Sequence, residues 1–289
     1  MNCIDQAHGE GFSIFNGDCV DVLKGIPAKS IDYSIFSPPF SSLYTYSNSP
    51  RDMGNCRTDK EFFEHFGFLV DELLRVMKPG HNVSFHCMLM PTSKERDGYI
   101  GLKDFRGDLI RAFQSKGFIY ASEVCIWKDP VTAMQRTKAL GLLHKTVREN
   151  ACMSRQGIPD YLVTVRAPGE MVDRVKHDPE QYPVTKWQRV ASPVWTDINP
   201  SDTLQYQSAR EHEDERHICP LQLQVIERGI DLWTNPGDVV LSPFTGIGSE
   251  GHVSLQMGRK FIGIELKRSY YLQATRNLQN ALKQTGMLL

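Results

Sequence analysis

The residues best suited to chemistry form a glycine-rich run from Ser242 to Gly251, which follows an apolar strand pattern and opens a helical one. Glycine lets the backbone turn tightly and approach a ligand, and a helix N-terminus offers free N–H groups to an anion. Glu265 ends the next apolar run fourteen residues later, where a carboxylate can accept hydrogen bonds from both hydroxyls of a ribose. The segment predicts a cofactor that contains a nucleoside, and it fits a nicotinamide dinucleotide as well as a methyl donor.

The second candidate site is the tetrapeptide Ser37, Pro38, Pro39 and Phe40, directly after the apolar segment 31–36. Two successive prolines fix φ and remove two backbone donors, so the chain leaves the sheet in a rigid, extended form. The Ser37 hydroxyl and the Pro38 carbonyl can then accept hydrogen bonds from an amino group held flat beneath Phe40. Strand ends also carry Ser and Pro as simple breakers, so this run alone does not separate a site from a turn.

The elements that position these runs alternate between short apolar strands and amphipathic helices, a pattern typical of βαβ units and a mostly parallel sheet. The expected strands cover residues 12–15, 31–36, 83–87, 119–127, 239–241 and 261–264. One expected helix begins near Thr58, which forms a capping box with Glu61. Further helices are expected over 104–116, over about 221–233 and at the end of the chain. These elements predict an α/β fold with one large domain.

Between residues 128 and 213 the periodicity fades, and the segment contains seven prolines. It is expected to be an insertion with weak regular structure. Residues 128–176 contain nine Lys or Arg against five Asp or Glu, a local excess that suits contacts with nucleic-acid phosphates. The basic positions are 128, 136, 138, 145, 148, 155, 166, 174 and 176.

Composition narrows the class of protein further. The chain has 289 residues, a formal net charge of −1 and seven cysteines without a CxxC pair, which favours reduced thiols and a cytoplasmic protein. No apolar run approaches the length of a membrane span, and the N-terminus does not resemble a signal peptide. His212, His217 and Cys219 do not complete a tetrahedral ligand set, so no metal site is expected.

The order of the two candidate sites resembles that of the circularly permuted (β-type) S-adenosylmethionine-dependent DNA amino-methyltransferases, the N4-cytosine/N6-adenine family. In that family the catalytic half precedes the cofactor half, and a target-recognition insertion lies between them. The resemblance implies a doubly wound, mostly parallel, Rossmann-like methyltransferase sheet. It divides the chain into a catalytic half (1–127), a target-recognition insertion (128–213) and a cofactor-binding half (214–289).

The resemblance also assigns roles to individual residues. It implies catalytic roles for Ser37, Pro38, Pro39 and Phe40. It implies contacts with S-adenosylmethionine for Asp18, Phe244, Thr245, Gly246, Gly248 and Glu265. The chain departs from the family at Ser242, where many members have an acidic residue, and at 217–222, which lacks the usual Gln-Lys-Pro. These departures concern the donor contacts.

The implied function is site-specific methylation of an exocyclic amino group in double-stranded DNA, as in restriction–modification systems, with a homodimer as one expected assembly. Because the amino nitrogen is a poor nucleophile, the enzyme must flip the base out and orient the nitrogen. Within the family, Ser at the first position of the tetrapeptide is more typical of cytosine N4, whereas Asp or Asn is more typical of adenine N6. Cytosine N4 is therefore favoured, with adenine N6 and RNA amino-methylation as alternatives.

Two other chemistries fit the sequence less well. Methylation at cytosine C5 requires a nucleophilic cysteine, normally after a proline, and none of the seven cysteines follows one. A nicotinamide-dependent oxidoreductase would use the same glycine loop. It would place that loop near the start of its nucleotide-binding half, and it gives no reason for the tetrapeptide at Ser37.

Overall fold

The computed structural model describes residues 2–40, 52–131, 144–150, 157–180, 182–205 and 220–286. The centre of this described part is a nine-stranded sheet. In spatial order the strands are β1 (Asp5–Gly9), β2 (Phe12–Asn16), β11 (Lys260–Glu265), β10 (Val239–Ser242), β3 (Ile31–Phe36), β4 (Met77–Met88), β8 (Asp160–Arg166), β7 (Ile119–Ile126) and β9 (Val194–Trp195). Neighbours from β2 to β4 are parallel, whereas β8 is antiparallel to β4 and β7, and β1 is antiparallel to β2. The predicted mostly parallel α/β sheet is confirmed.

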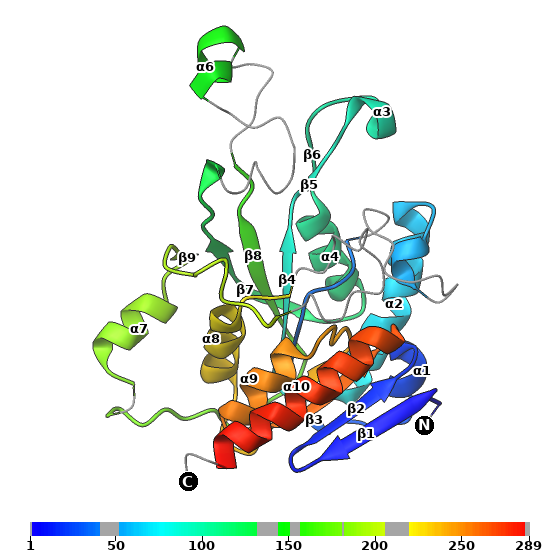
Figure 1. Cartoon of the computed structure of the whole chain (residues 1–289), viewed down its shortest axis with the longest axis vertical. Coiled ribbons are helices and arrows are strands. Elements are labelled where there is room, and N and C mark those ends of the chain that lie inside the picture. Colours follow the sequence, from blue (N-terminus) through cyan, green and yellow to red (C-terminus); the bar gives the residue numbers. More distant parts are fainter. Residues whose placement is uncertain are drawn as a thin grey trace.

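Helices cover both faces of this sheet (Figure 1). One face packs against α1 (Cys19–Leu23), α2 (Asp59–Val76) and α4 (Phe105–Ser115), and the other against α8 (Leu223–Trp233), α9 (Ser249–Gln256) and α10 (Arg268–Gly286). The shorter elements are η2 (Met53–Asn55), α3 (Lys94–Asp97), α6 (His144–Asn150), α7 (Val184–Val190) and the hairpin of β5 (Met90–Pro91) with β6 (Leu102–Lys103). The doubly wound arrangement is therefore confirmed.

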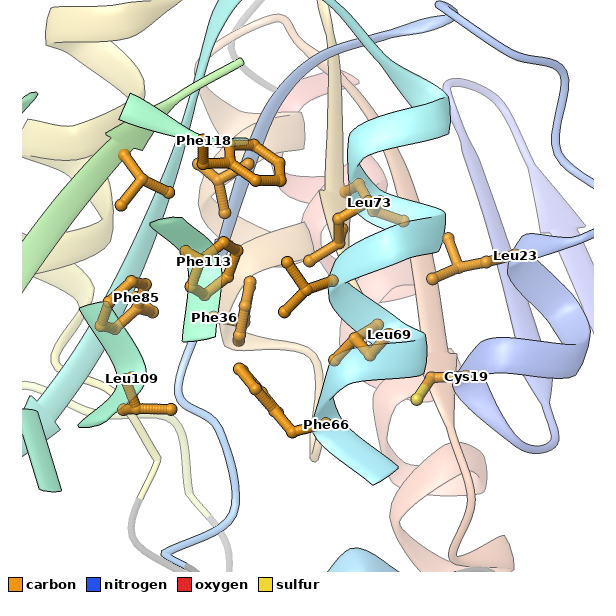
Figure 2. Close-up of a cluster of buried hydrophobic side chains, with 14 of the residues drawn as sticks. Cys19, Leu23, Phe36, Phe66, Leu69, Leu73, Phe85, Leu109, Phe113 and Phe118 are labelled. Carbon is orange, nitrogen blue, oxygen red and sulfur yellow. The ribbon is translucent and has the colours of Figure 1, made fainter. Parts of the chain in front are cut away.

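Helix α2 shows why the expected elements form. Thr58 caps it by accepting a hydrogen bond from the Glu61 N–H at 3.1 Å, which satisfies one of the unpaired donors of the first turn. Its apolar stripe packs on the sheet, where Phe66 lies beside Phe36 and Phe113 (Figure 2). Burying one such side chain contributes about 2–3 kcal/mol. This packing holds the end of β3, and with it the residues that follow.

Strand β8 departs from the weak regular structure expected between residues 128 and 213. It lies between β4 and β7, with Val163 and Val165 fully buried in one core and Leu162 buried in the other. A strand buried on both faces shows no clear alternation of polar and apolar residues. A seven-residue run between proline-containing segments is therefore hard to recognise as a strand from the sequence. The chain between 128 and 213 therefore contributes a central strand to the sheet.

The structure bears on two expectations from composition, reduced cysteines and the lack of a membrane-spanning segment. Cys3, Cys19, Cys56, Cys87 and Cys125 are free thiols. Within the described ranges, no helix has the length and apolar content needed to cross a bilayer.

Candidate functional site

The two candidate sites meet at the carboxyl edge of the sheet. Strands β3 and β10 are parallel neighbours, paired at Tyr33–Val240 and Ser34–Leu241, so the segments that follow them emerge side by side. The rings of Phe36 and Phe244 lie 5.8 Å apart between their centroids. The strand order reverses between β10 and β3. The carboxyl ends of the strands at such a switch point are the usual position of ligand sites in α/β sheets. The tetrapeptide at Ser37 and the glycine loop therefore lie side by side at one edge of the sheet and form a single candidate site.

Glu265 organises the glycine loop. Its carboxylate accepts hydrogen bonds from the backbone N–H groups of Gly246 and Lys267, both at 2.8 Å. The residue keeps some exposed surface, but burial of the carboxylate raises its pKa to about 7, although both N–H groups act in the opposite direction. The Thr245 N–H donates to the Ile264 carbonyl at 2.9 Å and its hydroxyl donates to the Ser242 carbonyl at 3.0 Å. Thr245 thus joins the glycine loop to β11 through Ile264 and to β10 through Ser242.

Two glycines let the loop and helix α9 approach their neighbours. Gly248 has φ +91°, a left-handed conformation that side chains rarely adopt, and a Cβ there would lie 3.2 Å from Ala274 on α10. A Cβ at Gly251 would lie 2.5 Å from both Leu278 and Phe261. The glycine spacing therefore serves close packing of α9 on α10 and β11, in addition to the tight turn.

The segment that leads into Asp18 is hydrogen-bonded to the end of β11 at Glu265. The Gly17 N–H donates to the Glu265 carbonyl at 3.1 Å, and the Asn16 amide donates to the carbonyls of Glu265 and Leu266. Asp18 caps α1, with its carboxylate accepting from the Asp21 N–H at 3.0 Å. Sequence reasoning missed Asn16, because a polar residue at a strand end has no distinctive pattern.

The tetrapeptide lies partly in the core. Pro38 is buried, and the partly buried Phe40 ring packs 5.9 Å from the ring of Phe105 on α4. Phe40 therefore packs on one side against the core, beside Ser37. The chain after Phe40 carries further apolar and aromatic side chains at Leu43, Tyr44 and Tyr46, which lie outside the described residues.

The structure adds a polar cluster that sequence reasoning missed. The Ser37 hydroxyl lies 3.4 Å from His86 Nδ1, and His86 Nε2 lies 3.0 Å from an Asp160 carboxylate oxygen. Lys128 Nζ contacts the same oxygen at 2.5 Å. Burial alone would raise the pKa of Asp160, but His86 and Lys128 outweigh it and hold the pKa below its ordinary value. These residues come from the ends of four strands, β3, β4, β7 and β8, so no sequence spacing reveals them.

The described basic residues of the predicted insertion do not form one surface. Lys128 is paired with Asp160, whereas Arg148 is exposed on α6, which projects beyond the sheet edge (Figure 1). Arg166 ends β8 opposite Asn82, at the edge away from Ser37. Arg174 and Lys176 bond through their backbones to Asn235, which lies at that same far edge. Arg136, Lys138 and Arg155 lie outside the described residues.

Glu250, in the first turn of α9, leads to a prediction about stability. Burial, reinforced by the nearby Glu265, raises its pKa to about 8. Because this pKa exceeds that of an unfolded Glu, stability should fall as the pH rises from about 4.5 through 8. Glu250→Gln removes the charge and keeps the shape. We expect it to match the wild type at pH 5 and to be more stable at pH 9 by on the order of 2–4 kcal/mol.

Urea unfolding at the two pH values measures this effect. A stability difference between Glu250→Gln and the wild type that stays constant from pH 5 to pH 9 would contradict a buried, titrating Glu250.

Comparison with known proteins agrees with this geometry. Residues 31–276 match the family model N6_N4_Mtase, described as DNA methylase. The type II methyltransferase M.BglII of Bacillus subtilis is 24% identical over 262 residues, which cover 89% of this chain and 66% of that protein. The DNA adenine methyltransferase YhdJ of Escherichia coli (strain K12) is 26% identical over 284 residues, which cover 94% of this chain and 84% of that protein. The chain thus spans just under two thirds of M.BglII.

Solved structures share the fold. TTHA0409 of Thermus thermophilus, determined in complex with S-adenosyl-L-methionine, has a TM-score of 0.69 at 20% identity, with 92% of each chain covered. The cytosine-N4-specific PvuII DNA methyltransferase has a TM-score of 0.67 at 16% identity, with 98% of this chain and 96% of that chain covered. Since the family model matches most of the chain, and the tetrapeptide and the glycine run meet in one site, the protein belongs to the N6/N4 DNA methylase family.

Proposed function

We propose that this protein transfers a methyl group from S-adenosylmethionine to an exocyclic amino nitrogen in double-stranded DNA, with cytosine N4 as the preferred target. The observation that carries the proposal is the 5.8 Å contact between Phe36 and Phe244, which brings the residue before Ser37 against the glycine loop. Family membership supports the reaction class. The similar proteins do not decide between the two bases, because YhdJ is named an adenine methyltransferase and PvuII methyltransferase a cytosine-N4-specific one. The preference for cytosine therefore rests on Ser37.

The residues of the glycine loop fit S-adenosylmethionine. No heavy atom lies within 4 Å of the position that a Cβ on Gly246 would take, so the backbone faces open space. The Glu265 carboxylate has about four lone-pair sites and uses two of them within the loop. The remaining sites can accept hydrogen bonds from two ribose hydroxyls. When bound, the cofactor supplies a methyl group on an electron-poor sulfonium.

The tetrapeptide then prepares the amino nitrogen. By accepting its two hydrogens, the Ser37 hydroxyl and the Pro38 carbonyl draw the nitrogen toward tetrahedral geometry and direct its lone pair. The rigid Pro38–Pro39 backbone keeps these acceptors in place. Flipping the base from a duplex costs a few kcal/mol, and stacking on the Phe40 ring recovers part of it.

Donor binding should depend on pH through Glu265. Its pKa is raised to about 7 by burial, and only the ionised carboxylate accepts freely from ribose hydroxyls. We therefore expect the affinity for S-adenosylmethionine to increase about tenfold from pH 6 to pH 8. Glu265→Gln should bind weakly at both pH values. Calorimetric titration measures this, and a variant with the same pH dependence as the wild type would remove Glu265 from donor binding.

Separate incubations of the protein and methyl-labelled S-adenosylmethionine with unmodified DNA and with RNA, followed by nucleoside mass spectrometry, test the proposed function. We expect N4-methylcytosine. N6-methyladenine would confirm the reaction class and correct the target. Label in RNA alone would replace DNA as the substrate. Measurable donor binding without label in any nucleic acid would contradict the proposal.

A further inference from the structure

We propose, on the basis of the proposed function, that His86 and Asp160 are positioning residues that orient the Ser37 hydroxyl toward the target amino group and carry away its proton. Neither residue belongs to the tetrapeptide or to the glycine loop. They deepen the proposed reaction by giving the proton lost from the amino nitrogen a defined destination.

The geometry of the strands places these side chains together. On β4, Phe85 and Cys87 point into the core beneath α2 and α4, so His86 between them points to the opposite face. Ser37 follows Phe36 of that same core and is likewise turned to the opposite face. Asp160 begins the antiparallel strand β8, so it lies at the edge where β3 and β4 end. The cluster is therefore built by three adjacent strands.

The charge of Asp160 determines which nitrogen of His86 carries hydrogen. Asp160 is 3% exposed and is held ionised by His86 and Lys128, so it can only accept hydrogen bonds. The facing nitrogen, Nε2, must then carry the hydrogen, which leaves a lone pair on Nδ1 toward Ser37. The side chain of His86 is 12% exposed, so water competes little for either nitrogen.

This arrangement fixes the orientation of the Ser37 hydroxyl. Its single hydrogen is donated to His86 Nδ1 at 3.4 Å, in preference to the His86 carbonyl at 3.5 Å, and both lone pairs of Oγ remain for the substrate. The contact from Ser37 to His86 is long, and among the described residues His86 Nε2 and Asp160 Oδ1 complete no hydrogen bond, although Nε2 lies 3.0 Å from Asp160 Oδ2. Catalytic hydrogen bonds are often loose before substrate binds and tighten in the complex.

The proton balance of the step is complete. The nitrogen lone pair forms the N–C bond to the methyl group while the C–S bond breaks, and its electron pair stays on sulfur. One N–H bond of the methylated nitrogen then breaks toward Ser37 Oγ, and the Ser37 hydroxyl proton passes to His86 Nδ1. The resulting imidazolium is stabilised by Asp160 and later releases its proton to solvent.

The test compares Asp160→Asn and His86→Gln with Thr164→Val in the full chain. Thr164 Oγ1 lies 2.8 Å from Ser84 Oγ and joins the same two strands, β4 and β8, away from Ser37, so it is the matched control. We expect Asp160→Asn and His86→Gln to lower kcat for DNA methylation about a hundredfold. Donor affinity should stay within about twofold of wild type in all three variants, and kcat should stay so in Thr164→Val.

A pH profile separates this role from a merely structural one. Among the described residues, the charged groups that contact His86 or its partner are Asp160 on β8 and Lys128 after β7. Because the proton of the reaction leaves through this cluster, we expect the wild-type kcat to fall at low pH, and Asp160→Asn to move this limb to lower pH. The limb should be absent in His86→Gln. An unmoved limb, or kcat within twofold of wild type in either variant, would overturn the inference.

A measurement independent of turnover distinguishes this inference from the proposed function. In ¹⁵N-histidine spectra we expect His86 of the wild type to carry its hydrogen on Nε2, and Asp160→Asn to weaken that preference. A hydrogen on Nδ1 of the wild type would overturn the inference even if methylation is observed. Should Asp160→Asn fail to bind the donor, His86→Gln decides the outcome. Absence of any methylated base with the wild type would instead refute the proposed function.

Discussion

Replacement of Ser37 by alanine is expected to lower kcat for DNA methylation by about a hundredfold or more while changing donor affinity less than about twofold. The hydroxyl is the group at this position that can accept an amino hydrogen, and it takes no part in the glycine-loop hydrogen bonds formed by Glu265 and Thr245. Since the interaction develops in the transition state, its loss should appear in kcat and not in binding. Single-turnover methylation and calorimetric donor titration measure the two quantities.

Ser34→Ala is the matched control for this variant. Ser34 lies on β3 three residues before Ser37, is fully buried, and donates a hydrogen bond to the Leu241 carbonyl at 2.9 Å. Its removal should cost about 1 kcal/mol of stability and leave kcat near the wild-type value. Equal turnover in Ser37→Ala and the wild type would exclude Ser37 from the reaction.

Gly248→Val is expected to weaken donor binding by about a hundredfold or more. The left-handed backbone at φ +91° is strained for any branched side chain, at a cost of about 1–3 kcal/mol. A Cβ at this position would point toward Ala274 on α10, at 3.2 Å. The valine should therefore push the loop away from Glu265. Calorimetry measures the affinity, and thermal unfolding measures the accompanying loss of stability.

Two further glycine variants separate local strain from loss of the site. Gly258 also has a positive φ, of +74°, with open space around its Cβ position at the far end of β11, so Gly258→Ala should reduce stability and preserve donor affinity. Gly246 has a positive φ of +54°, so Gly246→Ala should lower stability about as much as Gly258→Ala. Its methyl group also enters the open space of the loop, so only Gly246→Ala should in addition weaken donor binding. Normal donor binding by both Gly246→Ala and Gly248→Val would show that the donor binds elsewhere.

Much of the fold is present in local patterns. The capping signal of Thr58 and Glu61 is a local feature, and α2 begins at Asp59, directly after Thr58, as that signal predicts. The strands ending at Phe36 and Glu265 are equally clear, because apolar runs bounded by turn residues need no distant partner to be recognised. The family resemblance added the order of the two halves and the roles expected of Ser37 and Glu265.

The sequence by itself therefore determined the α/β class and marked the tetrapeptide and the glycine loop as candidate sites, because each is written in a few consecutive residues. Only the tertiary structure decided that β8 enters the sheet, that Arg166 lies on the edge away from the site, and that His86 meets Asp160 beside Ser37. The physical reason is that hydrophobic periodicity reports which face of an element is buried, whereas strand order and register depend on packing between residues distant in the chain.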